Sequence, residues 1–195
     1  MLTIRPASAR DIDTITEIYN TAGVGTTASY ALDPVSVEDR RAWLEAHVVA
    51  EQPVLVLEDD GEVVGYAAYG PFRSLAGYVH TVEHSVYIAE GRRAVGGGRM
   101  LMNALIDHAL GRNVHVMVGV IDATNEASIE FHRRLGFEET GRLPEVGLKF
   151  GQWRTVVFMT LILDGGGDPS PDVDLPPAGK SARLPYVHGL PRGLQ

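Results

Sequence analysis

The sequence predicts one α/β domain in which a mixed sheet carries helices on its faces. The first observation is the order of the segments, because strand-like and helix-like runs follow one another as β-α-α-β-β-β-α-β-α-β-β. The second is a set of local signals, namely helix caps, a hairpin turn and a buried strand, that agree with this order. The third is length, since 195 residues suffice for one domain with a substantial core and are few for two.

The N-terminal part is predicted to contain a short strand, two capped helices and a loop between them. Residues 2–5 have a strand pattern, and residues 8–11 (Ser-Ala-Arg-Asp) have the capping-box pattern that begins a helix. A second capping box at residues 36–39 predicts the next helix. Residues 21–34 are small, polar and glycine-bearing, with Tyr30 as their one large side chain. We therefore expect this segment to be a mobile loop over a site.

The middle of the chain is rich in β signals. Residues 54–58 and 63–69 are two β-rich runs joined around Asp60-Gly61, which is a strong hairpin signal. Residues 81–88 have a further strand pattern. Residues 114–121 are almost all apolar and predict a buried strand.

The last third is predicted to close the sheet and then to change character. Residues 125–135 have the pattern of a short helix, and residues 139–146 and 154–163 fit a final antiparallel pair. After Asp164 the chain becomes dense in Gly and Pro and cannot bury enough surface to offset its ordering entropy. The domain is therefore predicted to span residues 1–163, followed by a Gly/Pro-rich tail at residues 164–195.

Composition narrows the classes of function. A net charge of −8 argues against nucleic acid as the main partner, because binding to a phosphate backbone needs a basic surface. The absence of cysteine excludes disulfides, thiolate nucleophiles and cysteine metal sites. No apolar run approaches membrane-spanning length, and the N-terminus lacks the apolar core of a signal peptide. We therefore expect a soluble cytoplasmic protein without a membrane partner.

The most informative motif is the glycine-dense turn Arg93-Ala94-Val95-Gly96-Gly97-Gly98. It lies between the strand pattern at 85–88 and a helical pattern that begins at Arg99. Such a turn aims backbone N–H groups outward at the positive end of a helix dipole, which suits a pyrophosphate. It has neither the Gly-Lys-Ser/Thr ending of a P-loop nor the Gly-x-Gly-x-x-Gly dinucleotide fingerprint. A tight turn without a ligand is the alternative interpretation.

The strand pattern before this turn has two different faces. Alternation with period two places on one face Thr81, Glu83, Ser85 and Tyr87, and on the other Val82, His84, Val86 and Ile88. Glu83 is a candidate proton acceptor beside the phosphate cradle, and the alternative is a solvated strand carboxylate. Residues 80–84 also match the H-x-x-E-H zinc pattern, which requires a helix. In a strand the two histidines stand about 13 Å apart, so we predict no metal site.

Taken together, these features resemble the GCN5-related N-acetyltransferase (GNAT) superfamily across about residues 1–163. Its acetyl-CoA signature, Arg/Gln-x-x-Gly-x-Gly/Ala after the fourth strand, is matched by residues 93–98 at the expected place. Asn125 and Gly136-Phe137 resemble the superfamily's later asparagine and the Gly-Phe after its last helix. The resemblance implies a mostly antiparallel central sheet with flanking helices, the acyl-CoA N-acyltransferase fold, and acetyl-CoA as co-substrate.

A closer resemblance is to the phosphinothricin and methionine sulfoximine acetyltransferases. It rests on several blocks in the right order, which are residues 18–20, 26–34, 70–73 with Tyr78, 81–87 and 147–153. Many of these relatives carry a second arginine two positions after the one that Arg73 resembles, and here that position is Leu75. This departure bears on the recognition of a strongly anionic substrate such as phosphinothricin.

The resemblance implies roles for individual residues. Glu83 is expected to be the general base, and His132 either the general acid for the CoA thiolate or a second base. The residues expected to bind acetyl-CoA are Val86, Tyr87, Ile88, Arg93, Ala94, Val95, Gly96, Gly97, Gly98, Arg99, Asn125 and Ser128. The residues expected to bind the substrate are Tyr30, Phe72, Arg73, Tyr78, Glu83 and Ser85.

Three functions remain open at this point. The leading one is acetylation of the α-amine of a small amino acid such as methionine sulfoximine, methionine sulfone or phosphinothricin, in a detoxifying role. A second is acetylation of another small amine, which the acidic net charge favours. A third is a CoA-binding sensor that has lost catalysis. The resemblance also implies a homodimer.

Overall fold

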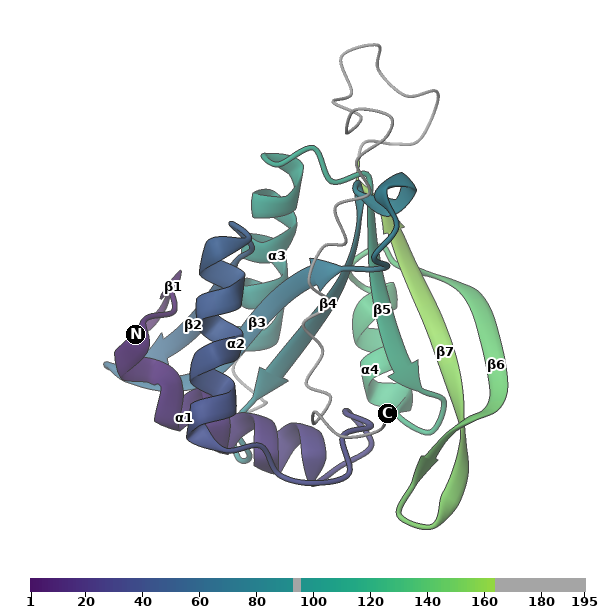
Figure 1. Ribbon diagram of the computed structural model, residues 1–195, viewed down its shortest axis with the longest axis horizontal. Helices are drawn as coiled ribbons and strands as arrows, with labels where there is room; N and C mark the ends of the chain where they lie inside the picture. Colours follow the sequence, from purple (N-terminus) through teal and green to yellow (C-terminus); the bar gives the residue numbers. More distant parts are fainter. Residues whose placement is uncertain (93–95, 164–195) are drawn as a thin grey trace.

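The computed structural model describes residues 1–92 and 96–163 and has one seven-stranded sheet flanked by helices (Figure 1). The strands are β1 (Leu2–Pro6), β2 (Val54–Asp59), β3 (Glu62–Pro71), β4 (Thr81–Ile88), β5 (Val116–Asp122), β6 (Glu138–Lys149) and β7 (Gln152–Ile162). The α-helices are α1 (Ile12–Ile18), α2 (Val37–Val49), α3 (Gly97–Leu110) and α4 (Glu126–Arg133). The predicted order of strands and α-helices is confirmed. Arg93, Ala94, Val95 and the predicted tail at 164–195 lie outside the described residues.

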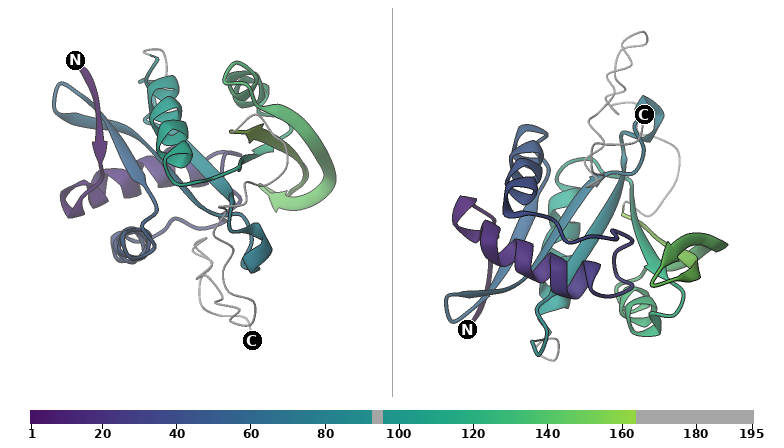
Figure 2. Two further views of the ribbon diagram at one scale, coloured as in Figure 1. Left: turned by 90° about the horizontal axis from the view of Figure 1, so that it is seen from above. Right: turned by 60° about the horizontal axis from the view of Figure 1, so that its bottom comes forward.

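The sheet is mixed and mostly antiparallel, as expected. Its strand order is β1-β2-β3-β4-β5-β7-β6, and the contact between β4 and β5 is parallel whereas the other neighbouring pairs are antiparallel. α1 and α2 cover one face, while α3 and α4 cover the other (Figure 2, left). The chain therefore forms three layers with the sheet in the middle.

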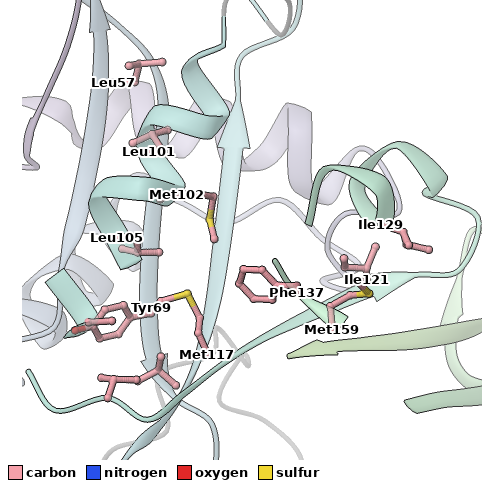
Figure 3. Close-up of a cluster of buried hydrophobic side chains, with 14 of the residues drawn as sticks. Leu57, Tyr69, Leu101, Met102, Leu105, Met117, Ile121, Ile129, Phe137 and Met159 are labelled. Carbon is pink, nitrogen blue, oxygen red and sulfur yellow. The ribbon is translucent and has the colours of Figure 1, made fainter. Parts of the chain in front are cut away.

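Each face of the sheet has its own apolar core. On the face of α3 and α4, buried side chains from the two helices meet those of five strands, and the core includes Leu101, Leu105, Met117, Phe137 and Met159 (Figure 3). On the face of α1 and α2, the core includes Ile12, Ile15, Leu44, Val56 and Tyr66. Burying apolar area of this kind stabilises a fold by about 25 cal/mol per Å². The two cores hold both helical layers firmly against the sheet.

Local signals in the sequence produce the predicted turns and caps. Asp60 and Gly61 have positive φ values of 50° and 86°, as the two-residue hairpin between β2 and β3 requires. The Ser36 side chain accepts a hydrogen bond from the Asp39 N–H and completes the capping box that begins α2. Residues 21–34 are corrected in one respect, because their first part continues α1 as a π-helix at Tyr19–Val24.

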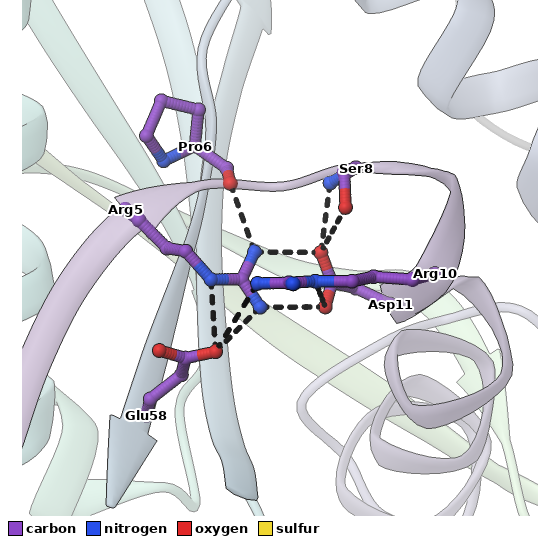
Figure 4. Close-up of polar contacts among 6 residues, drawn as sticks. All are labelled: Arg5, Pro6, Ser8, Arg10, Asp11 and Glu58. Carbon is purple, nitrogen blue, oxygen red and sulfur yellow. Dashed lines mark hydrogen bonds and ion pairs between the residues drawn. The ribbon is translucent and has the colours of Figure 1, made fainter. Parts of the chain in front are cut away.

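A charged network fixes the first strand to the first helix (Figure 4). The Arg5 guanidinium donates two hydrogen bonds to Asp11, at 2.7 and 2.8 Å, and contacts Glu58 of β2 at 2.6 Å. The Ser8 backbone N–H also donates to Asp11. These donors, with Arg5 the strongest, lower the pKa of the Asp11 carboxyl to about 2. Asp11, the last residue of the predicted capping box, is thus also half of a partly buried ion pair.

Candidate active site

β4 and β5 separate after a short stretch of pairing. Residues 81–83 of β4 pair with residues 116–118 of β5, and no pairing follows although β4 runs to Ile88 and β5 to Asp122. The two strands therefore open into a wedge in the middle of the sheet.

Backbone groups of β4 line this wedge. The Ala89 N–H donates to the Val64 carbonyl of β3, whereas the His80 carbonyl accepts from the Val116 N–H of β5. Because backbone groups of a strand alternate between its two edges, odd-numbered residues of β4 face β3 and even-numbered ones face β5. The N–H of Val86 consequently points into the wedge, where an extended ligand could pair with it as a strand would.

A cavity of about 500 Å³ passes through the sheet at the wedge. We call its two parts the α2-side half and the wedge half. Residues that line the α2-side half include Tyr30, Arg40, Trp43, Tyr66, Glu83, Ser85 and Tyr87. Residues that line the wedge half include His84, Val86, Gly119, Asn125, Ser128 and His132. One cavity thus reaches side chains that belong to both faces of the sheet.

The predicted alternation of β4 is confirmed by the two cores. Val82 is buried in the core of the α3–α4 face, and Tyr87 packs against Tyr66 in the core of the α1–α2 face. Glu83 and Ser85 share the face of Tyr87 and line the cavity. The Glu83 carboxylate is therefore placed on the α2 side of the wedge, next to the first unpaired segment of β4.

Two buried histidines form the floor of the wedge half. The rings of His84 and His132 stack with centroids 5.1 Å apart, and both rings lie against Gly119 of β5. His132 Nδ1 lies 2.7 Å from the Ser128 carbonyl, which can only accept, so Nδ1 carries the proton of the neutral ring. Burial lowers the pKa of His132, and burial together with His132 lowers the pKa of His84 still further. Both rings are consequently neutral at pH 7.

Three ring nitrogens of His84 and His132 have no hydrogen-bond partner among the described residues. His132 Nε2 and both ring nitrogens of His84 are buried and make no hydrogen bond to the described residues. Buried polar groups are normally paired, so these three atoms are available to a molecule in the cavity. His80, by contrast, lies outside the cavity lining and contacts the Asn113 carbonyl at 2.8 Å. Within the described residues, no three His, Asp or Glu side chains converge as metal ligands do.

Two helix N-termini adjoin the wedge. Gly96 has φ +74° and precedes α3, whose first turn holds Gly97, Gly98 and the exposed Arg99. A Cβ at Gly98 would lie 3.6 Å from Phe131 of α4 and 3.8 Å from Ile88, so α3 begins beside the end of β4. The free N–H groups of such a turn suit phosphate oxygens.

Glycine at position 97 has a packing reason as well. A Cβ there would lie 2.2 Å from Leu57 Cδ2, so a larger residue would push α3 away from β2. Asn125 caps α4 as predicted, because its side chain accepts from the Ser128 N–H. The N-termini of α3 and α4 are thus positioned by local contacts rather than by a ligand.

The segment that carries Tyr30 is held in place over the cavity. The Tyr30 hydroxyl donates to Asp122 Oδ2 at 2.8 Å, and burial raises the pKa of Tyr30. The buried Lys149 ammonium donates to the Ala31 carbonyl. Contacts from β5 and β6 therefore fix the loop that the sequence predicts as mobile.

Three predicted substrate residues do not reach the cavity lining in this chain. Phe72, Arg73 and Tyr78 follow the end of β3, and none of them contributes to the lining. Arg73 is exposed and stacks on the Phe72 ring at 4.4 Å, and Phe72 makes an edge contact with Tyr78. Ile88 and the described glycines of the turn, Gly96, Gly97 and Gly98, also lie outside the lining, whereas Tyr30, Glu83 and Ser85 contribute to it. A position just after β3 in the sequence therefore does not bring these side chains to the cavity, whereas the strand face shared by Glu83 and Ser85 does.

Sequence reasoning missed residues that line both halves. Arg40 and Trp43 come from α2, Tyr66 from β3, and Gly119 from β5. A signal for Arg40 exists, since buried residues of α2 recur at positions 40, 44 and 47, which is helical spacing. A charged side chain on the buried face of a helix marks a functional candidate.

Comparison with known proteins identifies the family. The model of the acetyltransferase (GNAT) family matches residues 13–137, more than half of the chain. A methionine sulfoximine/methionine sulfone acetyltransferase of Pseudomonas paraeruginosa is 47% identical over 162 residues, covering 83% of this chain and 94% of the relative.

Solved structures of acetyltransferases also resemble this chain in fold. An acetyltransferase of Salmonella typhimurium, solved with its cofactor acetyl-CoA, superposes with a TM-score of 0.83 at 44% identity and covers 88% of this chain and 99% of its own. A phosphinothricin acetyltransferase of Sinorhizobium meliloti in complex with acetyl-CoA gives 0.84 at 30% identity, covering 92% and 98%. The expected fold and the expected acetyl-CoA-dependent enzyme class are confirmed. The chain belongs to the acetyltransferase (GNAT) family.

Proposed function

We propose that this protein transfers the acetyl group of acetyl-CoA to the α-amine of methionine sulfoximine or methionine sulfone. The observation that carries the proposal is the single cavity through the wedge, which has a carboxylate, Glu83, in one half and a neutral histidine, His132, in the other. The 47% identical relative that acts on these two amino acids supports the choice of acceptor. Phosphinothricin is a further candidate acceptor, because a phosphinothricin acetyltransferase is also a relative of this chain, at the lower identity of 33%.

Glu83 acts as the general base. An amino acid binds as an ammonium, and its nitrogen becomes a nucleophile only after it loses a proton. The Glu83 carboxylate accepts that proton, directly or through one water, from an acceptor in the α2-side half. The Val86 N–H faces the wedge and donates to the thioester oxygen, where negative charge develops during attack.

His132 acts first as the second base and then, once protonated, as the acid for the CoA sulfur. Its Nδ1–H is held by the Ser128 carbonyl, and its lowered pKa keeps Nε2 deprotonated at neutral pH. Nε2 therefore accepts the second proton of the reacting nitrogen and delivers it to the departing sulfur. The imidazole ends the cycle unchanged, and the CoA leaves as a thiol.

Acetyl-CoA, when bound, supplies the acetyl group as a reactive thioester. The wedge accepts its extended arm along Val86, Tyr87 and Ile88, while the glycine turn and Arg93 hold its pyrophosphate. Ala94, Val95 and Arg99 complete the predicted cradle, with Asn125 and Ser128 on the opposite side of the wedge. Unpaired N–H groups at the wedge and at the start of α3 support this assignment.

The acceptor lies in the α2-side half, against Tyr30 and Ser85. We retain Phe72, Arg73 and Tyr78 as candidates for its recognition, although they lie outside the cavity lining of one chain. We also propose that the enzyme works in the cytoplasm and serves in detoxification. Among residues 1–92 and 96–163, no helix is both long and apolar enough to cross a membrane.

We propose a homodimer in which the β6–β7 hairpin lies in the interface. This hairpin extends from the edge of the sheet (Figure 1). Its exposed apolar side chains include Leu143, Val146, Leu148, Phe150 and Trp153. An apolar patch of this kind marks an interaction surface, and a second copy of the chain is the occupant that the family resemblance implies. Sedimentation of the wild type as a dimer and of Trp153→Glu as a monomer is the expected result.

Thiol release with a panel of acceptors tests the proposed function. We expect turnover with methionine sulfoximine and methionine sulfone, and weaker turnover with phosphinothricin because Leu75 replaces an arginine. Preference for a polyamine or another amine would move the enzyme to a different acceptor. Absence of turnover with every amine, despite acetyl-CoA binding, would favour a CoA-binding sensor.

A further inference from the structure

Arg40 of α2 is a buried cation in the wall of the cavity. Only 6% of its surface is exposed, and its Nε is buried without a hydrogen-bond partner. Within residues 1–92 and 96–163, its guanidinium donates no hydrogen bond and forms no ion pair. Its contacts are aromatic, because Cζ lies 4.0 Å from the ring centroid of Tyr19 and 4.6 Å from that of Trp43.

Other buried or partly buried cations of the described residues have oxygen partners, and the most distant of these is Asp122, whose Oδ2 lies 4.0 Å from Arg154 Nε. Lys149 donates to the Ala31 carbonyl, and Arg5 is held by Asp11 and Glu58. A charge that is removed from water without such partners destabilises a fold. Cation–π contacts offset only part of that cost. Arg40 therefore lacks an oxygen acceptor among the described residues.

The position of Arg40 shows where the missing partner would lie. Arg40, Trp43, Tyr66 and Tyr87 line the α2-side half of the cavity, the same half that Glu83 reaches. Arg40 Nε has no hydrogen-bond partner among the described residues, and Arg40 lines the cavity, so a molecule bound there can supply the missing acceptor. A guanidinium matches the two oxygens of a carboxylate.

We infer that Arg40 binds the α-carboxylate of the acceptor amino acid. The inference rests on the proposed function, since it assumes an amino acid in the α2-side half. It assigns opposite tasks to two residues of that half: Glu83 receives the proton of the ammonium, and Arg40 holds the carboxylate on the same α-carbon. Arg40 thereby selects amino acids over simple amines, whereas Arg73 is the arginine that the sequence analysis expects to bind the substrate.

The test compares an acid with its decarboxylated counterpart. The kcat/KM values for methionine sulfone and for 3-(methylsulfonyl)propylamine are measured with the wild type, Arg40→Met and Arg40→Lys. A charge-assisted hydrogen bond contributes about 1.5–3 kcal/mol, so we expect Arg40→Met to lose roughly 10- to 100-fold on the acid, mainly through KM. The amine should change less than about threefold, and Arg40→Lys should fall between the two.

A merely structural role predicts a different result. If Arg40 only joined α1 to α2, Arg40→Met would lower kcat/KM for acid and amine by the same factor, and this outcome overturns the inference. Arg41→Met is the matched control, because Arg41 is the next residue of α2, lies outside the cavity lining and forms an ion pair with the exposed Glu38. A loss selective for the acid in Arg73→Met, but not in Arg40→Met, would assign the carboxylate to Arg73 instead.

Binding of the product separates this inference from the proposed function. Calorimetry with N-acetyl-methionine sulfone needs no turnover, and its Kd should rise by the same factor in Arg40→Met. An unchanged Kd refutes the role of Arg40 even if the enzyme acetylates methionine sulfone. An Arg40-dependent Kd in a wild type that turns over no amino acid would refute the proposed reaction and leave the carboxylate site standing. Thermal denaturation of each variant shows whether it is folded.

Discussion

The two halves of the cavity differ in the polar groups that line them. The wedge half offers backbone N–H groups and the neutral rings of His84 and His132. The α2-side half holds two ionisable side chains, Glu83 and Arg40, and Arg40 Nε has no hydrogen-bond partner among the described residues. A dipolar half suits a thioester whose charge develops only during reaction, and a charged half suits a zwitterionic acceptor. This difference explains why one cavity can hold two unlike substrates in a fixed orientation.

The largest expected effect is in the α2-side half. Replacement of Glu83 by Gln keeps the shape of the side chain and removes the base, so kcat should fall by about 10²–10⁴-fold. Acetyl-CoA affinity should be unchanged, because its contacts belong to the wedge half. Steady-state kinetics and calorimetry check the two quantities. Unchanged turnover would remove Glu83 from the mechanism, and a parallel loss of acetyl-CoA binding would show that the two halves are not separate.

A second prediction concerns stability away from both halves. The pKa of Asp11 is lowered from 3.8 to about 2, so its ion pair with Arg5 stabilises the fold. The stabilisation is roughly 2 kcal/mol. It is fully present above about pH 4 and is lost as the pH falls through the folded pKa near 2. Urea unfolding of Asp11→Asn at pH 7 should show this loss with little change in KM.

Asp13→Asn is the control for this pair, since Asp13 is exposed on the first turn of α1. If the two variants unfolded at the same urea concentration, the ion pair would have no role in stability. If Asp11→Asn instead raised KM strongly, the network would be coupled to the cavity.

The third prediction tests the floor of the wedge half. A Cβ at Gly119 would lie 3.0 Å from His84 Nε2 and 3.4 Å from His132, so Gly119→Ala must displace one or both rings. Since misplacement of a catalytic group by a fraction of an ångström slows proton transfer, kcat should fall by about tenfold. Gly141→Ala is the control, because a methyl group at that position would have no neighbouring atom within 4 Å among the described residues. Equal activity of both alanine variants would mean that the histidine stack is not part of the site.

The smallest effect is a shift in pH dependence. Because His132 must be neutral to accept a proton and burial lowers its pKa, kcat should decline only as the pH falls below 6.5. His132→Asn should lower kcat at pH 7 and abolish that decline. A wild-type midpoint at or above 6.5, or an identical profile in the variant, would contradict the role of His132 as a base.

The two halves also differ in how far the sequence reveals them. The wedge half was predictable in part, because Asn125 and His132 lie on a short helix that the sequence marks by a cap and a following glycine. The face of Glu83 followed from strand alternation. Arg40 was not predicted, because its place beside Tyr19 and the cavity depends on how α2 packs on the sheet. Arg73 illustrates the converse, since a residue close to β3 in sequence is exposed in the fold.

The most direct test of the two-half cavity is a crystal structure with CoA and N-acetyl-methionine sulfone bound together. We expect the CoA sulfur in the wedge between Val86 and His132, the acetamide beside Glu83, and the product carboxylate paired with Arg40. A product whose carboxylate lies on Arg73, or whose acetamide lies away from Glu83, would contradict this division of the site.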